Sequence, residues 1–213
     1  MKAIKFIMGV AVALSLGFSA VSCSNDDTDY SNVTPPQTDT KMTIAKAEVG
    51  VNFKFTEDFL NAYDVAIEYT DSNGVFHSEA FDKSKATITK IVELSTEFVG
   101  KTTNVYNYKK LIETKIPQNI NTQIKATPKS NIPTFDSEIA YFGFGFDYQI
   151  KMKNANNEVI KMSQNFEDAR FLEYEVDQKD ITSFSSGLGE LLKLTTATFQ
   201  IQKNGQYNAI LPK

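Results

Sequence analysis

Apolar and polar residues alternate along much of this chain, a pattern typical of β-strands with one buried face. The alternation covers four stretches, residues 45–55, 63–69, 140–152 and 195–201. The third stretch is the longest, and every second position from 142 to 148 is a large aromatic: Phe142, Phe144, Phe146 and Tyr148. Such a stripe would promote aggregation if it faced solvent, so we expect it to face a core.

Turn-forming residues follow three of these stretches and predict three hairpins. Asp71-Ser72-Asn73-Gly74 leads into a return strand at 75–81, and residues 154–157 lead into one at 159–162. Asn204-Gly205 is a strong two-residue hairpin signal and precedes the last strand, residues 206–211. Hairpins join neighbouring antiparallel strands, so antiparallel sheets are expected.

Helical periodicity is confined to one region near the end of the chain. The apolar residues there have roughly helical spacing: Ile181, Phe184, Leu188, Leu191 and Leu192. Serines and glycines between them, at 185–187 and 189, lower the helix propensity. We therefore expect only a short helix, at about Gly189 to Leu194.

These patterns predict an all-β fold, an antiparallel β-sandwich of immunoglobulin-like or fibronectin-III-like type. Pro128 and Pro133 mark a break between two strand-rich halves. Each half, at about 85 residues with six or seven short strands, matches the size of such a sandwich. The hallmark tryptophan is absent, and the chain has a single cysteine.

The two halves also resemble each other in sequence. Residues 63–71 align without gaps with residues 146–154, at an offset of 83. This favours two tandem similar units, residues 42–129 and 138–213. Two hairpins that merely share an alternating pattern would look the same, and the alternative is one larger β-sandwich over residues 41–213.

The N-terminus has the order of a secretory signal peptide. Lys2 and Lys5 precede an apolar run from Phe6 to Val21, and small residues then lead to Cys23. The run has 16 residues, fewer than the roughly 20 that cross a bilayer as a helix. A secreted protein that used disulfides would carry cysteines in pairs, whereas Cys23 is the only cysteine.

Ala20-Val21-Ser22-Cys23 resembles the lipobox of bacterial lipoproteins, with Ala20 where leucine is commonest. Ser24, Asn25, Asp26 and Asp27 then resemble the acidic export signal of surface-exposed lipoproteins of the Bacteroidota. The resemblance covers about the first 30 residues and implies an address, not an activity. It implies that residues 1–22 are removed, that Cys23 is lipidated, and that the protein is anchored in the outer membrane, exposed at the cell surface.

A polar, proline-containing segment separates this anchor from the strand-rich part. Residues 23–41 hold few large apolar side chains and the pair Pro35-Pro36, so we expect a flexible tether that holds the rest away from the membrane. Loss of Lys2 and Lys5 leaves 20 of the 22 basic residues against 26 acidic ones, a formal net charge of −6. An acidic chain without a basic cluster is a poor nucleic-acid binder, so no nucleic-acid partner is expected.

No residue set in the sequence predicts catalysis, a metal site or a cofactor. His77 is the only histidine, and no glycine-flanked serine accompanies it. Two adjacent acidic pairs, Glu57-Asp58 and Glu167-Asp168, are expected in loops, and sequence neighbours do not supply the carboxylate separation of a glycosidase. Met152 and Met162 are conceivable haem ligands, but Met152 continues the aromatic stripe and is expected in the core.

One pair of aromatic residues is a candidate ligand platform. Tyr106 and Tyr108 are expected near a loop, where they would offer an aromatic surface to a sugar or a protein. The function predicted is therefore a non-catalytic, surface-anchored binding module for a host, matrix or glycan ligand, or an accessory subunit of a surface complex. The alternatives are an enzyme whose site is assembled from separate strands and a purely structural envelope lipoprotein.

Overall fold

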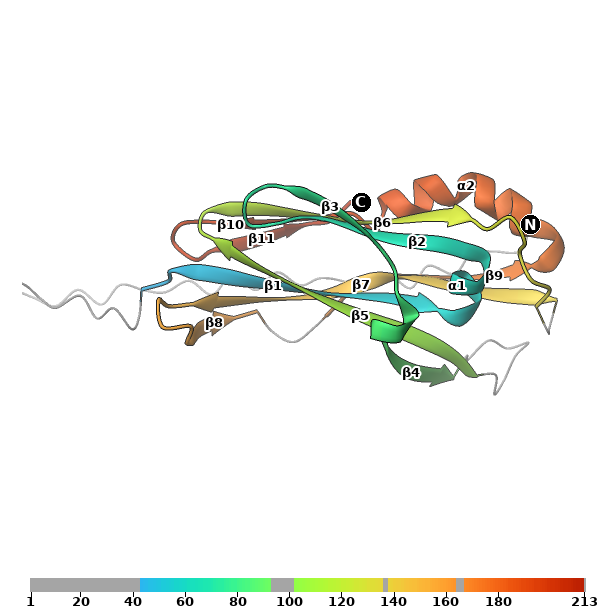
Figure 1. Cartoon of the computed structure of the whole chain (residues 1–213), viewed down its shortest axis with the longest axis horizontal. Coiled ribbons are helices and arrows are strands. Elements are labelled where there is room, and N and C mark those ends of the chain that lie inside the picture. Colours follow the sequence, from blue (N-terminus) through green and yellow to red (C-terminus); the bar gives the residue numbers. More distant parts are fainter. Residues whose placement is uncertain (1–42, 93–101, 136–137, 164–166, 213) are drawn as a thin grey trace, which may run out of the picture.

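Two antiparallel β-sheets lie one above the other in the structure, a computed structural model that describes residues 43–92, 102–135, 138–163 and 167–212 (Figure 1). The fold was expected to be all-β; the described residues are mostly β, with two α-helices, and the expected pair of antiparallel sheets is confirmed. Cys23 and the tether lie outside the described residues.

One sheet has six strands and curls into a half-barrel, and we call it the curled sheet. Its strand order is β4 (Thr87–Val92), β5 (Thr102–Lys115), β1 (Lys46–Thr56), β7 (Ile139–Lys153) and β8 (Val159–Met162). A further strand, β9 (Glu167–Asp177), pairs with the first part of β7, whereas β8 pairs with its last residues.

The second, five-stranded sheet covers one face of the curled sheet. Its strand order is β11 (Tyr207–Ile210), β10 (Ala197–Ile201), β6 (Gln118–Pro128), β2 (Tyr63–Thr70) and β3 (Phe76–Ala80). The chain passes from one sheet to the other between β5 and β6, at the cis peptide bond Ile116-Pro117.

Both sheets contain strands from the first and second halves of the sequence. In the curled sheet β1 pairs with β7, and in the five-stranded sheet β6 pairs with β10. A single cluster of buried apolar residues includes members from 47 to 201. The strands of residues 42–129 and 138–213 are thus interleaved, and whether they unfold together is a matter for experiment.

The hairpin turns predicted at 71–74 and 154–157 are confirmed and share one hydrogen-bonding pattern. The Asp71 side chain accepts from the amides of Asn73 and Val75, at 2.8 and 3.0 Å. The Asn154 side chain accepts in the same way two and four residues later, at 3.0 and 2.9 Å. The offset of 83 therefore extends to the turn geometry, although the two hairpins belong to different sheets.

Helix α2 (Ile181–Lys193) is longer than the short helix expected from the sequence. Its serines and glycines have low helix propensity, but tertiary packing of an apolar stripe outweighs propensity. Leu188 and Leu192 are buried, and the ring of Phe184 lies 5.3 Å from that of Phe142. The helix thus covers the core beside β6 (Figure 1).

Two expected loops are regular structure instead. Glu57 and Asp58 open helix α1 (Glu57–Ala62), where acidic side chains interact favourably with the helix dipole. This helix buries Phe59 and Leu60 between β1 and β2. Glu167 and Asp168 begin strand β9, so the prediction of loops at both acidic pairs was wrong.

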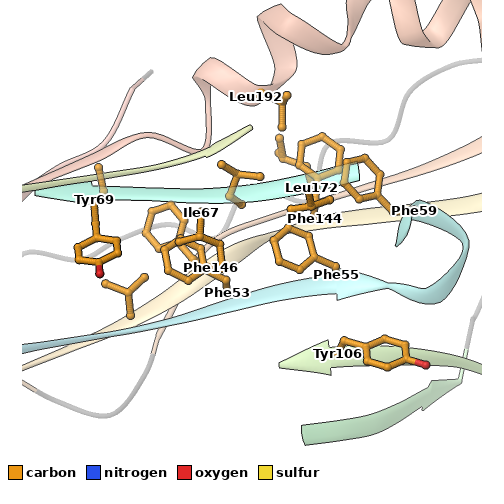
Figure 2. Close-up of a cluster of buried hydrophobic side chains, with 14 of the residues drawn as sticks. Phe53, Phe55, Phe59, Ile67, Tyr69, Tyr106, Phe144, Phe146, Leu172 and Leu192 are labelled. Atoms are coloured by element: carbon orange, nitrogen blue, oxygen red, sulfur yellow. The ribbon is translucent and has the colours of Figure 1, made fainter. Parts of the chain in front are cut away.

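The core between the sheets is rich in aromatic rings. Phe53 and Phe55 of β1 and Phe144 and Phe146 of β7 are fully buried, as the alternation predicted (Figure 2). Phe142 of β7 is fully buried as well. Phe59 lies among them, with its ring centroid 4.7 Å from that of Phe144. Met152 is also fully buried, which confirms its expected place in the core.

Candidate functional site

The lipidation and export-signal residues predicted from the sequence lie outside the described part of the chain. This applies to Cys23 and to Ser24, Asn25, Asp26 and Asp27. Within the described residues, no helix is long and apolar enough to span a membrane. The anchor therefore remains a prediction from the sequence.

Tyr106 and Tyr108 lie in strand β5, not near a loop, and opposite Phe55 and Phe53 of β1. Tyr106 is 8% exposed, and its hydroxyl donates to Glu57 at 3.3 Å. Tyr108 is partly buried, with its ring 5.9 Å from that of Phe81. Both rings are on the core side of β5, so their role as a ligand platform stays a prediction.

His77 belongs to a polar cluster at one edge of the two sheets. Its Nε2 lies 3.0 Å from a carboxylate oxygen of Asp71, and its ring stacks on Tyr69 at 5.0 Å. The Tyr69 hydroxyl donates to Glu79 at 2.6 Å, and Lys110 donates to the same Glu79 oxygen at 2.7 Å. Lys110 comes from the curled sheet and Glu79 from the five-stranded sheet, so their ion pair links the two sheets.

The pKa values of this edge cluster follow from its mutual contacts. The bond from Lys110, aided by that from Tyr69, lowers the pKa of Glu79. Burial, and then the bond to Glu79, raises the pKa of the Tyr69 hydroxyl. These contacts therefore favour the ionised form of Glu79 and the neutral form of Tyr69, the two forms that make the hydrogen bond between them. Such mutual stabilisation is expected of groups with a structural role.

A trough lies on the face of the curled sheet that points away from the core. Its volume is about 460 Å³. Five strands line it: β1 with Asn52 and Lys54, β4 with Thr89, β5 with Val105 and Asn107, β7 with Asp147, and β9 with Phe171 and Glu173. Val105 and Asp147 are buried in its floor, whereas Thr89 and Glu173 are exposed at its rim. The trough is concave because the curled sheet bends between β4 and β9.

Two glycines of β7 permit this curl. Gly145 is opposite Lys54 of β1 and Phe171 of β9. A Cβ atom at Gly145 would lie 1.9 Å from the carbonyl oxygen of Arg170 and 2.7 Å from Cα of Phe171, so no larger residue fits there. At Gly143 a Cβ atom would lie 2.8 Å from the Phe171 ring. Glycine inside a strand commonly marks such a close approach of another backbone.

A polar network covers the middle of the trough. Lys54 Nζ lies 2.8 Å from Asp147 Oδ1, and Asn52 donates to the other oxygen of Asp147 at 3.2 Å. Asn52 also donates to Asn107 at 3.4 Å, and Asn107 donates to Thr89 at 3.0 Å. The side chain of Asp147 is 7% exposed and that of Lys54 is 21% exposed. A carboxylate this buried requires a charged partner, and Lys54 supplies it.

Phe171 provides the aromatic wall of the trough. Its ring leans over Gly143, and Lys54 Nζ lies 5.9 Å from the ring centroid. Glu173, two residues on, accepts a hydrogen bond from the Tyr141 hydroxyl. The trough therefore combines one aromatic ring with amide, hydroxyl, ammonium and carboxylate groups, which can both donate and accept hydrogen bonds.

The described residues hold no group of three or more histidine, aspartate or glutamate side chains arranged to bind a metal ion. Comparison with known protein families, with curated proteins and with solved structures finds no match. The trough geometry is therefore the main source of functional inference for the folded part.

Sequence reasoning did not identify the trough, although one signal for it was present. Gly143, Gly145 and Asp147 alternate with the aromatic stripe in the sequence and therefore belong to the opposite face of its strand. Two glycines at every second position of a strand indicate a close approach on that face. Lys54 and Asn52 carried no such signal, because their proximity to Asp147 depends on the pairing of β1 with β7.

Proposed function

We propose that this protein is a lipid-anchored lipoprotein of the outer membrane, exposed at the cell surface, that binds a polar ligand in the trough without catalysis. The N-terminal resemblance to lipoproteins supports the address. The trough supports the binding role, because its volume falls in the range of about 300–1,000 Å³ typical of small-ligand sites. The ligand would be a glycan or a segment of a protein.

The observation that carries the binding role is the nearly buried Lys54–Asp147 pair in the trough floor. If the Lys54–Asp147 pair served only to stabilise the fold, apolar residues could replace it with little loss of stability. Here the two charged residues lie beside Asn52 and Asn107 in the lining of a concave surface. The proposal needs only the two-sheet arrangement; an immunoglobulin-like or fibronectin-III-like topology stays a prediction on which it does not depend.

An enzyme is the second candidate, and one observation favours it. Asp147 and Glu173 both line the trough, and glycoside hydrolysis uses a pair of carboxylates. Asp147, however, is paired with Lys54, and Glu173 accepts from Tyr141. Incubation with a ligand that binds, followed by product analysis, separates the two: turnover abolished by Glu173→Gln would establish an enzyme.

The anchor is tested at the native N-terminus. Mass spectrometry of the protein from its own membrane should show a mature chain that begins at a lipid-modified Cys23. A mature form that begins elsewhere, or that keeps residues 6–21, would refute the lipoprotein assignment.

The surface address is tested by changing the acidic segment after Cys23. Alanine at Asn25, Asp26 and Asp27 should leave lipidation intact but reduce cleavage of the protein by protease added to whole cells. Equal cleavage of the altered and natural proteins would show that these residues do not direct export.

The binding role is tested by NMR titration of the purified protein with separate panels of oligosaccharides and short peptides. A ligand of the trough should shift the amide signals of Asn52, Lys54 and Asn107, and Lys54→Gln should weaken its binding. Lys125→Gln, on the outer face of the five-stranded sheet, is the matched control and should leave binding unchanged. Binding that responds equally to both changes, or no binding from either panel, would refute the trough as the site.

A further inference from the structure

We propose that the ligand of the trough is a neutral saccharide, with one sugar ring laid on Phe171 and its hydroxyl groups bonded to the Lys54–Asp147 pair. This inference rests on the proposed function, because it identifies the ligand class of the same site. The argument comes from three features of the trough: the aromatic wall, the mixed polar floor and the balance of charge.

The aromatic wall of the trough stands beside the Lys54 ammonium. Across the curled sheet, one row of paired residues runs Asn107, Lys54, Gly145 and Phe171. Because Gly145 has no side chain, the backbone of Phe171 approaches β7 closely, and the centroid of the Phe171 ring lies 5.9 Å from the Lys54 ammonium. A flat group with an apolar face fits against such a ring, and the C–H face of a sugar is of this kind.

The polar floor offers donors and acceptors side by side. Lys54 donates only, the Asp147 carboxylate accepts only, and the Asn52 and Asn107 amides do both. Each sugar hydroxyl both donates and accepts, so neighbouring hydroxyls can bond to an ammonium and a carboxylate that lie 2.8 Å apart. A purely apolar ligand would displace water from these groups without making a hydrogen bond to them, which costs free energy.

The charge of the lining selects against acidic ligands. Among the described residues that line the trough, Lys54 is the one cation, whereas Asp147 and Glu173 are both carboxylates. Lys54 already balances Asp147, so an acidic sugar or a phosphate would meet Glu173 as an unbalanced like charge. An extended peptide, in turn, commonly binds by adding a strand at a sheet edge, and the trough is a sheet face.

The experiment is an NMR titration of the purified protein with neutral oligosaccharides that contain gluco, galacto, manno or N-acetylhexosamine units. Each is paired with an acidic analogue in which a uronic acid replaces the sugar. We expect at least one neutral compound to shift the trough amides of β1 and β7, and its uronic-acid analogue to bind at least about threefold more weakly.

Phe171→Ala should weaken binding of that compound about tenfold, because it removes the stacking surface. Phe171→Leu keeps an apolar side chain against Gly143 and should still weaken binding, which preserves the test if the alanine variant fails to fold. Phe76→Ala is the control, because Phe76 is an exposed phenylalanine of β3, at 56% exposure and on the other sheet. It should leave binding unchanged.

The outcomes separate this inference from the proposed function. Trough shifts with peptides alone, or tighter binding of the acidic analogues, would overturn the neutral saccharide and leave the binding role standing. Saccharide binding that survives both Phe171 variants would also overturn it. No trough shift with either class would overturn both proposals.

Discussion

Strand β7 shows two opposite uses of one alternating sequence. Its core side carries Phe142, Phe144 and Phe146, all fully buried. Its other side carries Gly143 and Gly145, against which β9 packs, and Asp147, which lines the trough. Both sides of β7 are closely packed. On the core side large aromatic rings fill the space, whereas on the trough side the glycines have no side chain and β9 comes close to the backbone of β7.

The difference between the two faces lies in what occupies the space next to the strand. Rings from β1 and α1 fill the core side, and Phe144 stacks on Phe59. On the trough side the backbone of β9 comes so close that only glycine fits at 145. The packing of the buried face of β7 therefore depends on large side chains. The close approach of β9 on the other face depends on positions that have no side chain.

The largest effect is expected on the core face, for Phe144→Ala. Loss of burial together with a cavity should lower the free energy of unfolding by about 3–5 kcal/mol. Denaturant unfolding measures this change, with Phe76→Ala as the control, since an exposed phenylalanine should cost within about 0.5 kcal/mol. A loss below about 1 kcal/mol at Phe144 would contradict its role in the core.

The same unfolding curve reports how many cooperative units the chain forms. Each sheet combines strands from residues 42–129 and 138–213, and one apolar cluster joins them. We therefore expect a single transition that is identical by fluorescence and circular dichroism. Two separate transitions would instead indicate two tandem units.

A smaller loss is expected on the trough face, for Gly145→Ala. The added methyl group would collide with backbone atoms of Arg170 and Phe171, so β9 must shift, at a cost of about 1–3 kcal/mol. Gly187→Ala is the matched control, because nothing lies within 4 Å of a Cβ atom there and the residue is exposed in α2. That change should raise stability by roughly 0.5–1 kcal/mol. Equal effects of the two changes would mean that the curl does not require Gly145.

The smallest expected effect is on the pH dependence of stability, which should differ between the outer face and the core face of the curled sheet. Glu48 lies on the outer face of the curled sheet, and bonds from Lys153 and Lys151 hold its pKa below the ordinary 4.5 despite partial burial. Its contribution is therefore present above about pH 4.5 and is lost as the pH falls through the lowered pKa. Glu48→Gln should flatten the loss of stability between about pH 5 and pH 3.

Phe144→Ala provides the contrast, since burial of a hydrocarbon ring does not titrate. Its cost should be the same at pH 7 and pH 4. A Glu48→Gln variant whose stability falls with acid as steeply as that of the natural protein would assign the acid sensitivity to other carboxylates. Glu79, whose pKa is lowered by its bond from Lys110, would be the next to change.

The sequence alone determined the features that depend on neighbours along the chain. Alternation located β1, β2, β7 and β10, and the turn residues located the three hairpins. These predictions succeeded because side chains alternate across a strand and because tight turns restrict which residues fit. The full burial of Phe142, Phe144 and Phe146 followed from the same periodicity, whereas Tyr148, the last of the stripe, is only partly buried.

The features that depend on distant segments are visible only in the folded structure. Asn52 and Asp147 are 95 positions apart, and Lys54 reaches Asp147 only because β1 pairs with β7. The full length of α2 likewise depends on the core that its apolar stripe meets, against a weak local propensity. Strand pairing and packing between remote segments leave no periodic trace in sequence, and the trough is built from those contacts.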